Sequence, residues 1–311
     1  MKNNAKSYRE IALIGIALIV TDIARTSQAR EFADISKFTK IEIPAAFGSG
    51  ALPSGINPRG DIVGTYTSSI YPFTNSVGFV LSKGTFTSIE VPGSIPGSTN
   101  VVGINPRGEI VGYYTENNQN QDFVGFLLSK GTFSTIEVPG STFSPATGIN
   151  PQGDILGFYF DSSGIGHGYL LSKGTFTSID VPGAPVGSTF ASAINAQGDI
   201  VGTYTDRSGI GHGFLLSKGT LTNIDVPGAL TESTNPTAIN PERDIVGYYF
   251  DSNRNAHGFL WSKGAYTTID VPLAFGSGTA AFGINPQGDI VGTYSVCSDG
   301  SCSPHGFLLS K

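Results

Sequence analysis

The chain has 311 residues, of which 39% are hydrophobic and only 14% are charged, and its formal net charge is −6. An acidic chain without a basic stripe lacks the electrostatic footprint that binding of nucleic acid or of an anionic membrane requires. The 42 glycines and 18 prolines lie between regularly spaced apolar segments, so they indicate turns in a packed β protein.

The first 29 residues have the three-part layout of a secretory signal peptide. Lys2, Lys6 and Arg9 form a basic start, residues 11–20 are apolar, and a small-residue cleavage site ends at Ala29. These ten apolar residues are too few to span a bilayer, which needs about 20. We therefore expect cleavage near Ala29, a mature chain without a transmembrane segment, and a secreted extracellular or periplasmic location. The alternative is an uncleaved amphipathic anchor.

Six copies of one unit follow. Each contains an Ile-Asn pair, and successive asparagines are 48 and then 45 residues apart: Asn57, Asn105, Asn150, Asn195, Asn240 and Asn285. In the third copy the pattern predicts four short strands, A to D, over residues 146–150, 154–160, 167–172 and 175–181. The connections Asn-Pro-x-Gly-Asp and Lys-Gly have turn chemistry. Two copies depart from it, with Ala196 in place of Pro and Arg243 in place of Gly, and we expect locally tolerated strain there.

A period of 40 to 50 residues with four strands per copy is typical of propeller blades. A β-solenoid usually has shorter coils, and independent modules of 45 residues could not bury an adequate core. Apolar residues on both faces of the strands fit blades that stack face to face. We therefore predict an all-β fold: a single six-bladed β-propeller domain over residues 30–311, with four antiparallel strands per blade.

The two ends of the repeat region complement each other. Residues 38–43 read as a lone D strand, and the chain stops at Lys311 just after a C strand. The N-terminal strand is therefore expected to complete the last blade as its outermost strand. Such a closure joins the ends of the ring and covers a sheet edge that would otherwise invite aggregation.

The C strands and their neighbours resemble the extracellular repeats of the HAF family, named for a His-Ala-Phe tripeptide. The match rests on HGFLLSKG at 212–219, HGFLWSKG at 257–264 and the Ala-Ile-Asn-Pro-x-Gly-Asp-Ile-Val-Gly segments, and it covers residues 38–311. Gly replaces the Ala of the family, and Val77 and Val124 replace His in the first two blades. The resemblance implies export and a repeated fold, and it brings no established reaction.

Four histidines share one position in the last four blades, and each has an aspartate six residues earlier. In a six-bladed ring with strand A innermost, these imidazoles would be well over ~10 Å apart, too far to share a metal ion. We expect no metal or cofactor there, and predict a structural hydrogen-bonded clasp across each B–C hairpin. The pairs are Asp161 with His167, Asp206 with His212, Asp251 with His257, and Asp299 with His305.

Two further patterns have structural interpretations. A tyrosine lies nine residues after each repeat asparagine, from Tyr66 to Tyr294, and its presence in every blade favours packing between blades over a sugar-stacking surface. Carboxylates dot the D strands, where a charge blunts edge pairing, and are assigned no site. Cys297 and Cys302 are expected to form a disulfide in an exported protein.

Only the B–C hairpins carry insertions. From the B-strand Tyr to the C-strand aromatic, blades 1 to 6 have 13, 12, 10, 10, 10 and 13 residues, so the longer loops of blades 6, 1 and 2 are neighbours in a closed ring. We predict that this crest of loops holds the ligand-binding residues; the alternative is drift of surface loops. The candidates are Tyr71, Phe73, Asn117, Asn118, Asn120 and Phe123.

The chain has neither a Gly-x-Ser-x-Gly elbow with suitable partners nor a phosphate-binding glycine loop. The sequence therefore favours a non-enzymatic extracellular binding module for a glycan or a surface protein. Two alternatives stay open: a propeller lyase or hydrolase acting at the axial mouth, and a purely structural surface repeat.

Overall fold

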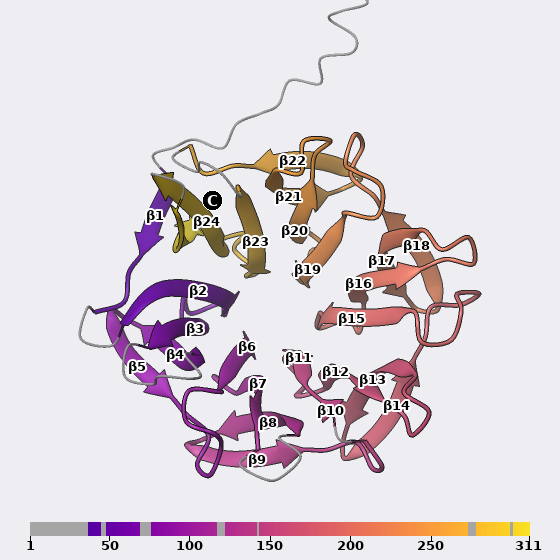
Figure 1. Cartoon of the computed structure of the whole chain (residues 1–311), viewed down its shortest axis with the longest axis horizontal. Coiled ribbons are helices and arrows are strands. Elements are labelled where there is room, and N and C mark those ends of the chain that lie inside the picture. The colour runs from indigo at the N-terminus through magenta and orange to yellow at the C-terminus, as the bar shows by residue number, and fades with distance from the viewer. Residues whose placement is uncertain are drawn as a thin grey trace, which may run out of the picture. The chain divides into compact units, whose positions relative to one another are not determined.

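A computed structural model of the chain describes residues 37–44, 48–68, 76–116, 122–141, 143–272, 278–298 and 301–311. The expected signal peptide lies outside these residues. The regular structure of the described part is entirely β, and Figure 1 shows six sheets arranged radially around an open centre. The predicted six-bladed propeller is therefore confirmed.

Each blade is an antiparallel sheet whose strands follow the order A, B, C, D from the axis outward. Blade 1 consists of β2 (Gly48–Ile56), β3 (Ile62–Ser68), β4 (Ser76–Ser82) and β5 (Thr85–Ile89). Blade 2 consists of β6 (Asn100–Ile104), β7 (Ile110–Thr115), β8 (Phe123–Ser129) and β9 (Thr132–Ile136). Blade 3 consists of β11 (Ala146–Ile149), β12 (Ile155–Phe160), β13 (Gly166–Ser172) and β14 (Thr175–Ile179).

The second half of the ring repeats the pattern. Blade 4 consists of β15 (Thr189–Ile194), β16 (Ile200–Thr205), β17 (Gly211–Ser217) and β18 (Thr220–Ile224). Blade 5 consists of β19 (Asn235–Ile239), β20 (Ile245–Phe250), β21 (Ala256–Ser262) and β22 (Ala265–Ile269). Blade 6 consists of β23 (Thr279–Ile284), β24 (Ile290–Ser298), β25 (Ser301–Leu309) and the N-terminal β1 (Phe38–Ile41). One short strand, β10 (Phe143–Ser144), pairs in parallel with β8 and so links blades 2 and 3.

The ring closes as the chain ends predict. β1 pairs antiparallel with the outer edge of β25, with Phe38 opposite Leu309 and Ile41 opposite Gly306. The sheet order is β1-β25-β24-β23, which makes β1 the outermost strand of blade 6. The strand ends at Ile41, two residues earlier than the sequence indicates. The N-terminal strand therefore occupies the predicted place.

The core consists of six apolar clusters between neighbouring blades. One cluster combines Val63 of blade 1 with Val101, Ile110 and Phe126 of blade 2. At the position of Phe126, every C strand carries a fully buried aromatic residue: Phe79, Phe126, Tyr169, Phe214, Phe259 and Phe307. The recurrent B-strand tyrosines are buried in five of the six blades, and Tyr159 is half-buried. This burial supports the packing interpretation of the tyrosines.

The glycine of the His-Gly-Phe motif allows close packing of successive blades. A Cβ atom built on Gly213 would lie 2.8 Å from the ring of Pro236 in the A strand of the next blade, and would also meet the Ile224 carbonyl. Gly306 meets Pro53 in the same way at the closure of the ring. At these two junctions the blades approach too closely for a methyl group, so glycine is required at this position of the motif.

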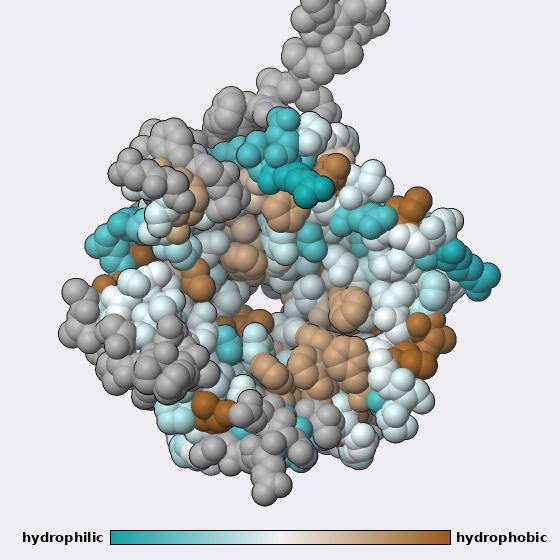
Figure 2. Space-filling view, viewed as in Figure 1, coloured by the Kyte–Doolittle hydropathy of each residue, from teal (hydrophilic) through white to brown (hydrophobic). Residues whose placement is uncertain are grey.

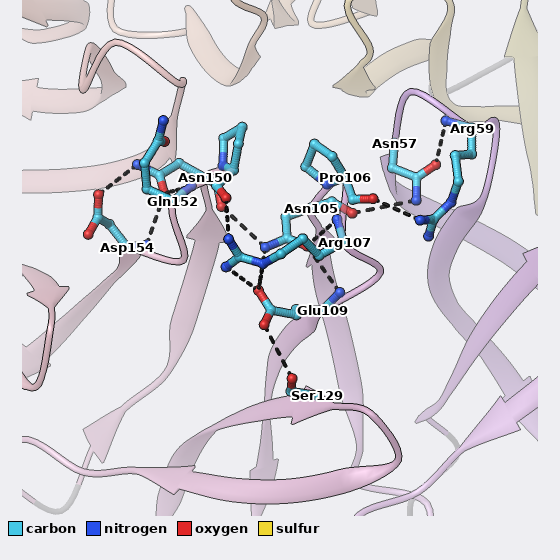
Figure 3. Close-up of polar contacts among 11 residues, drawn as sticks. Asn57, Arg59, Asn105, Pro106, Arg107, Glu109, Ser129, Asn150, Gln152 and Asp154 are labelled. Carbon is cyan, nitrogen blue, oxygen red and sulfur yellow. Dashed lines mark hydrogen bonds and ion pairs between the residues drawn. The ribbon is translucent and has the colours of Figure 1, made fainter.

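The A–B turns also join blades, which the sequence does not predict (Figure 3). The Asn105 side chain caps its own turn through Oδ1, which accepts from the amides of Arg107 and Glu109. Its Nδ2 donates to the Asn150 carbonyl of the next blade at 3.3 Å, and Arg107 Nη1 donates to the Pro151 carbonyl at 2.7 Å. Blade 1 makes the same two contacts to blade 2.

Candidate functional site

The antiparallel order of the strands divides the turns between two faces. The B–C hairpins and the connections from strand D to the next strand A lie on one face, here called the BC face, and the A–B and C–D turns lie on the other. The B–C segments that are longer in the sequence, those of blades 6, 1 and 2, connect strands that end on this face, and their residues 69–75, 117–121 and 299–300 lie outside the described residues. A ligand site on that face would therefore be formed by the segments in which the blades differ most.

The six A strands surround an axial cavity. The third residue before each repeat asparagine faces it: Ser54, Val102, Thr147, Ser192, Thr237 and Phe282. Toward the BC face the cavity measures about 280 Å³, and its lining there includes Phe158 and Phe190. Toward the other face a narrower part of about 100 Å³ is lined by the Gly/Ala-Ile pairs that precede the asparagines.

Three of the hydroxyl side chains that line the axial cavity donate hydrogen bonds to backbone carbonyls of the next blade. Ser54 Oγ donates to the Val101 carbonyl at 2.7 Å, and Thr237 Oγ1 donates to the Ala281 carbonyl at 2.8 Å, in each case across a blade junction. Thr147 bonds the Ala191 carbonyl in the same way. The wide part of the cavity therefore offers a mainly apolar surface, and the described residues that line it include no ionisable side chain.

Beside the axial cavity a continuous series of aromatic rings crosses blades 2 to 4. The ring centroids are 5.4 Å apart for Phe123 and Phe143, 5.2 Å for Phe143 and Phe160, and 5.9 Å for Phe158 and Phe190. Figure 2 shows this region as a brown patch next to the central opening, over β10, β12 and β15. We call it the aromatic row, and its members are Tyr113, Phe123, Phe143, Phe158, Phe160 and Phe190.

Three side chains of the aromatic row are exposed to solvent. Phe123, Phe160 and Phe190 have 40%, 38% and 41% of their surface accessible, although large aromatic side chains are usually buried. Contiguous exposed apolar surface of this kind marks a binding site more often than isolated exposed residues do. Of the crest residues predicted from the sequence, only Phe123 lies within the described part, and it belongs to this row; Tyr71, Phe73, Asn117, Asn118 and Asn120 lie outside the described residues.

Sequence reasoning missed most of the aromatic row. Eight residues after the repeat asparagine, blades 1, 4 and 6 have threonine, whereas blades 2, 3 and 5 have an aromatic residue: Tyr113, Phe158 and Tyr248. The alternation of B-strand side chains places this position on the sheet face opposite to that of the invariant tyrosine one residue later. A comparison of the copies position by position would have identified it.

Each predicted Asp–His pair of blades 3 to 5 is brought together. The distance from the His Nε2 to the hairpin Asp Oδ2 is 3.5 Å for His167, His212 and His257 alike. The other oxygen of each aspartate caps its own hairpin: Asp206 Oδ1 accepts from the amides of Ser208 and Ile210. For the fourth pair, Asp299 lies outside the described residues. The stabilising role of the pairs stays a prediction.

A second carboxylate, for which the sequence predicts no site, faces each of these histidines from the end of strand D. Nδ1 lies 2.9 Å from Asp225 in His212 and 3.0 Å from Asp270 in His257, whereas His167 is 3.8 Å from Asp180. The imidazole also packs on the neighbouring tyrosine, with centroids 5.2 to 5.4 Å apart. Each of the three histidines thus lies between two aspartates, and the spacing of 13 residues was the missed signal.

The electrostatic environments of the histidines differ. Burial opposes protonation of His212, but the hydrogen bond and charge of Asp225, helped by Asp206, outweigh it and raise its pKa. Burial and the nearby Lys40 instead lower the pKa of His305. Hydrogen bonds from the hairpin, first of all from the Asn255 amide, lower the pKa of Asp251 to about 2. Within the described part of the chain, no group of three or more His, Cys, Asp or Glu side chains has an arrangement that could hold a metal ion.

Cys297 and Cys302 form a disulfide, as predicted, and it joins β24 to β25 near the tip of the blade 6 hairpin. The described residues contain no helix that is long and apolar enough to cross a membrane.

No protein-family model and no curated protein matches the chain. The HAF resemblance therefore rests on the sequence motifs alone. Solved propellers match its fold at low identity. AofleA from Arthrobotrys oligospora is 14% identical over 88% of this chain and 91% of its own, with a TM-score of 0.51. A putative TolB from Agrobacterium tumefaciens is 14% identical over 84% and 90%, with a TM-score of 0.52.

A Trypanosoma rangeli sialidase is 11% identical over 91% of this chain and 59% of its own, with a TM-score of 0.50. At such identities the likeness establishes the propeller fold and does not extend to activity.

Proposed function

We propose that this protein is an exported, non-enzymatic binding module that takes carbohydrate on its BC face. The observation that carries the proposal is the aromatic row beside the axial cavity. Sugar rings present an apolar C–H face, and aromatic side chains offer a rigid apolar surface of matching size. A row of several rings fits a chain of sugar units better than a single small ligand.

The negative net charge of the protein bears on which class of glycan it would bind. The formal net charge is −6, and removal of the expected signal peptide would make it −8 because that segment carries four basic and two acidic residues. Like charges across an interface are strongly unfavourable. The protein is therefore expected to prefer neutral glycans over those rich in uronic or sialic acids.

The longer loops of blades 6, 1 and 2 belong to the same proposal. Phe123 follows the blade 2 insertion and contacts Phe143 of the row. We include the crest residues Tyr71, Phe73, Asn117, Asn118 and Asn120, which lie outside the described residues, in the proposed binding surface. Exposed aromatics beside amide groups suit a sugar ligand. An extracellular protein as partner is the alternative use of this surface.

Export is supported by the disulfide. Disulfides persist in oxidising compartments such as the periplasm and the extracellular space. The Cys297–Cys302 bridge and the signal-like residues 1–29 therefore point in the same direction.

A lyase or hydrolase at the axial mouth is less well supported. Such an enzyme would need inward carboxylates or another acid–base pair. The wide part of the axial cavity is instead lined by Ser, Thr, Val, Ala and Phe side chains.

A glycan array tests the proposed function. The purified protein is expected to bind neutral oligosaccharides, and the double variant Phe123→Ser, Phe160→Ser to bind them at least about tenfold more weakly, because it loses two stacking surfaces. Val186→Ser is the matched control, since Val186 is an exposed apolar residue outside the row. A Tyr71→Ala, Phe73→Ala variant tests the crest separately. If the unmodified protein bound no glycan on the array, carbohydrate binding would be refuted.

A further inference from the structure

A second cavity on the BC face lies at the junction of blades 4 and 5. It measures about 230 Å³, and we call it the blade 4–5 pocket. Unlike the axial cavity, it is lined mainly by polar side chains. Its lining includes Phe190, Thr203, Thr205, His212, Glu232 and Asn235.

The pocket is open because of two small residues in the B strand of blade 4. Thr203 and Thr205 occupy the positions that hold Phe158 and Phe160 in blade 3. The register of the two sheets is the same, since Thr203 pairs with Gly213 as Phe158 pairs with Gly168. The larger rings of blade 3 thus belong to the aromatic row, whereas the threonines of blade 4 leave a hollow next to it.

Glu232 places a carboxylate at this hollow. Its backbone has a left-handed conformation, which favours glycine over residues with a side chain. Its φ is +65°, and the equivalent residues in two other D–A connections are Gly97 and Gly187, with φ of +72° and +82°. A side chain held in the left-handed region carries a conformational penalty, and such outliers concentrate at functional sites. Among the described residues, no hydrogen bond or ion pair uses the Glu232 carboxylate or the Thr203 and Thr205 hydroxyls, so no polar interaction of this side chain in that part offsets the penalty.

The pocket continues the aromatic row. Phe190 lines both the axial cavity and the blade 4–5 pocket, and its ring centroid lies 5.9 Å from that of Phe158. A ligand stacked along the row would therefore reach the pocket at its end. There it would meet a half-exposed ring on one side and hydroxyl, amide and carboxylate groups on the other.

We propose that the blade 4–5 pocket binds one neutral sugar residue, with Glu232 accepting hydrogen bonds from its hydroxyls and Phe190 supporting its apolar face. This inference rests on the proposed carbohydrate binding and adds a subsite to it. A carboxylate can accept from two neighbouring hydroxyls at once, and charge-assisted hydrogen bonds are stronger than neutral ones. Glu232, together with Asp206 and Asp225 beside His212, disfavours an anionic sugar in the same place.

Saturation-transfer NMR with methyl glycosides of glucose, galactose, mannose and fucose tests the subsite, with methyl glucuronide as the acidic comparison. The unmodified protein is expected to bind at least one neutral glycoside. Glu232→Gly restores the residue of Gly187 and should weaken that binding at least tenfold while the melting temperature stays equal or rises. Thr203→Phe copies blade 3 and should abolish it by filling the pocket.

Arg254→Gly is the matched control, because Arg254 also has a φ of +65° but does not line the pocket. It should leave glycoside binding unchanged. Equal binding by the unmodified protein, Glu232→Gly and Thr203→Phe would overturn the subsite, as would failure of every neutral glycoside to bind. Array binding that is lost in the Phe123→Ser, Phe160→Ser variant but kept in both pocket variants would overturn the subsite while leaving the proposed function intact.

Discussion

His212 of blade 4 contacts two aspartates, one on each side of its imidazole ring. It lies between a hairpin aspartate, which also caps its own turn, and an aspartate at the end of strand D. The contact to Asp225 at 2.9 Å is shorter than that to Asp206 at 3.5 Å. The predicted clasp across the B–C hairpin is therefore one half of a two-sided arrangement, and the half that the sequence missed has the better geometry.

The His212 pair should make stability depend on pH. Because Asp225 and Asp206 raise the folded pKa of His212, this stabilisation is present in full below the usual value of about 6.5 and is lost as the pH rises through the folded pKa. We expect Asp225→Asn to lower the free energy of unfolding by about 0.5–1 kcal/mol at pH 6 and by less at pH 8, as for a partly exposed ion pair. Urea denaturation at both pH values measures the difference.

Double-mutant cycles separate the two partners of His212. The coupling of His212→Gln with Asp225→Asn should exceed its coupling with Asp206→Asn, which keeps the hairpin cap through the Asn side-chain oxygen. Strictly additive effects in both cycles would argue against either carboxylate acting through the imidazole.

At the scale of the element, the A–B turn both reverses the chain and joins the blades. Blades 1 and 2 use Arg59 and Arg107 to bond the next blade, whereas blade 5 reverses the direction: Arg243 reaches back to Asp199 of blade 4 at 2.7 Å. The Asp199 side chain is only 1% exposed. Arg243 occupies a glycine position with a φ of +65°, so the locally tolerated strain expected from the sequence has an identifiable compensation.

Arg243→Gly is therefore expected to destabilise the protein although it restores the glycine of the other blades. Removing the side chain from a left-handed backbone position raises the free energy of unfolding by about 1 kcal/mol. Leaving the buried Asp199 carboxylate without its ion pair lowers it by more. Because Asn195 still donates to Asp199 and Arg243 is half-exposed, the net loss should be about 1–2 kcal/mol in chemical denaturation. Arg254→Gly relieves the same strain without breaking an ion pair within the described residues, so it should be neutral or stabilising. A stabilising Arg243→Gly would show that the ion pair is negligible.

At the scale of the whole molecule, the ring depends on β1. Phe38 packs edge-on against Phe307 at 5.5 Å between centroids, and Ile41 belongs to the apolar cluster between blades 6 and 1. The strand joins residues at opposite ends of the sequence and covers the outer edge of β25. Loss of β1 would thus remove core contacts and expose a sheet edge together.

A chain beginning at residue 42 should therefore be less stable than one beginning at residue 30. We expect a loss of at least about 2–5 kcal/mol, the range for deleting one large buried aliphatic side chain, together with concentration-dependent association. Guanidinium denaturation and light scattering after gel filtration measure the two effects. Equal midpoints and a monomeric shortened chain would show that the ring closes without β1.

The sequence alone determined the repeat, the number of blades, the turns, the ring closure and the disulfide. These features follow from local chemistry and period: glycine and proline punctuate the strands, alternation sets their faces, and equal copies leave few ways to stack. The Asp–His pairs were also predictable. The two residues are six positions apart and flank the B–C hairpin, so the reversal of the chain brings them close together.

Only the tertiary structure decided which residues meet across blades. The aromatic row, the contacts of Arg107 and Arg243 to other blades and the blade 4–5 pocket join residues about 45 apart or bring together single departures from the repeat. Such contacts depend on the twist and spacing of neighbouring sheets, which no single copy encodes. From the sequence, Thr203 is an ordinary strand residue. The structure shows that it leaves open the space that Phe158 fills at the equivalent position of blade 3.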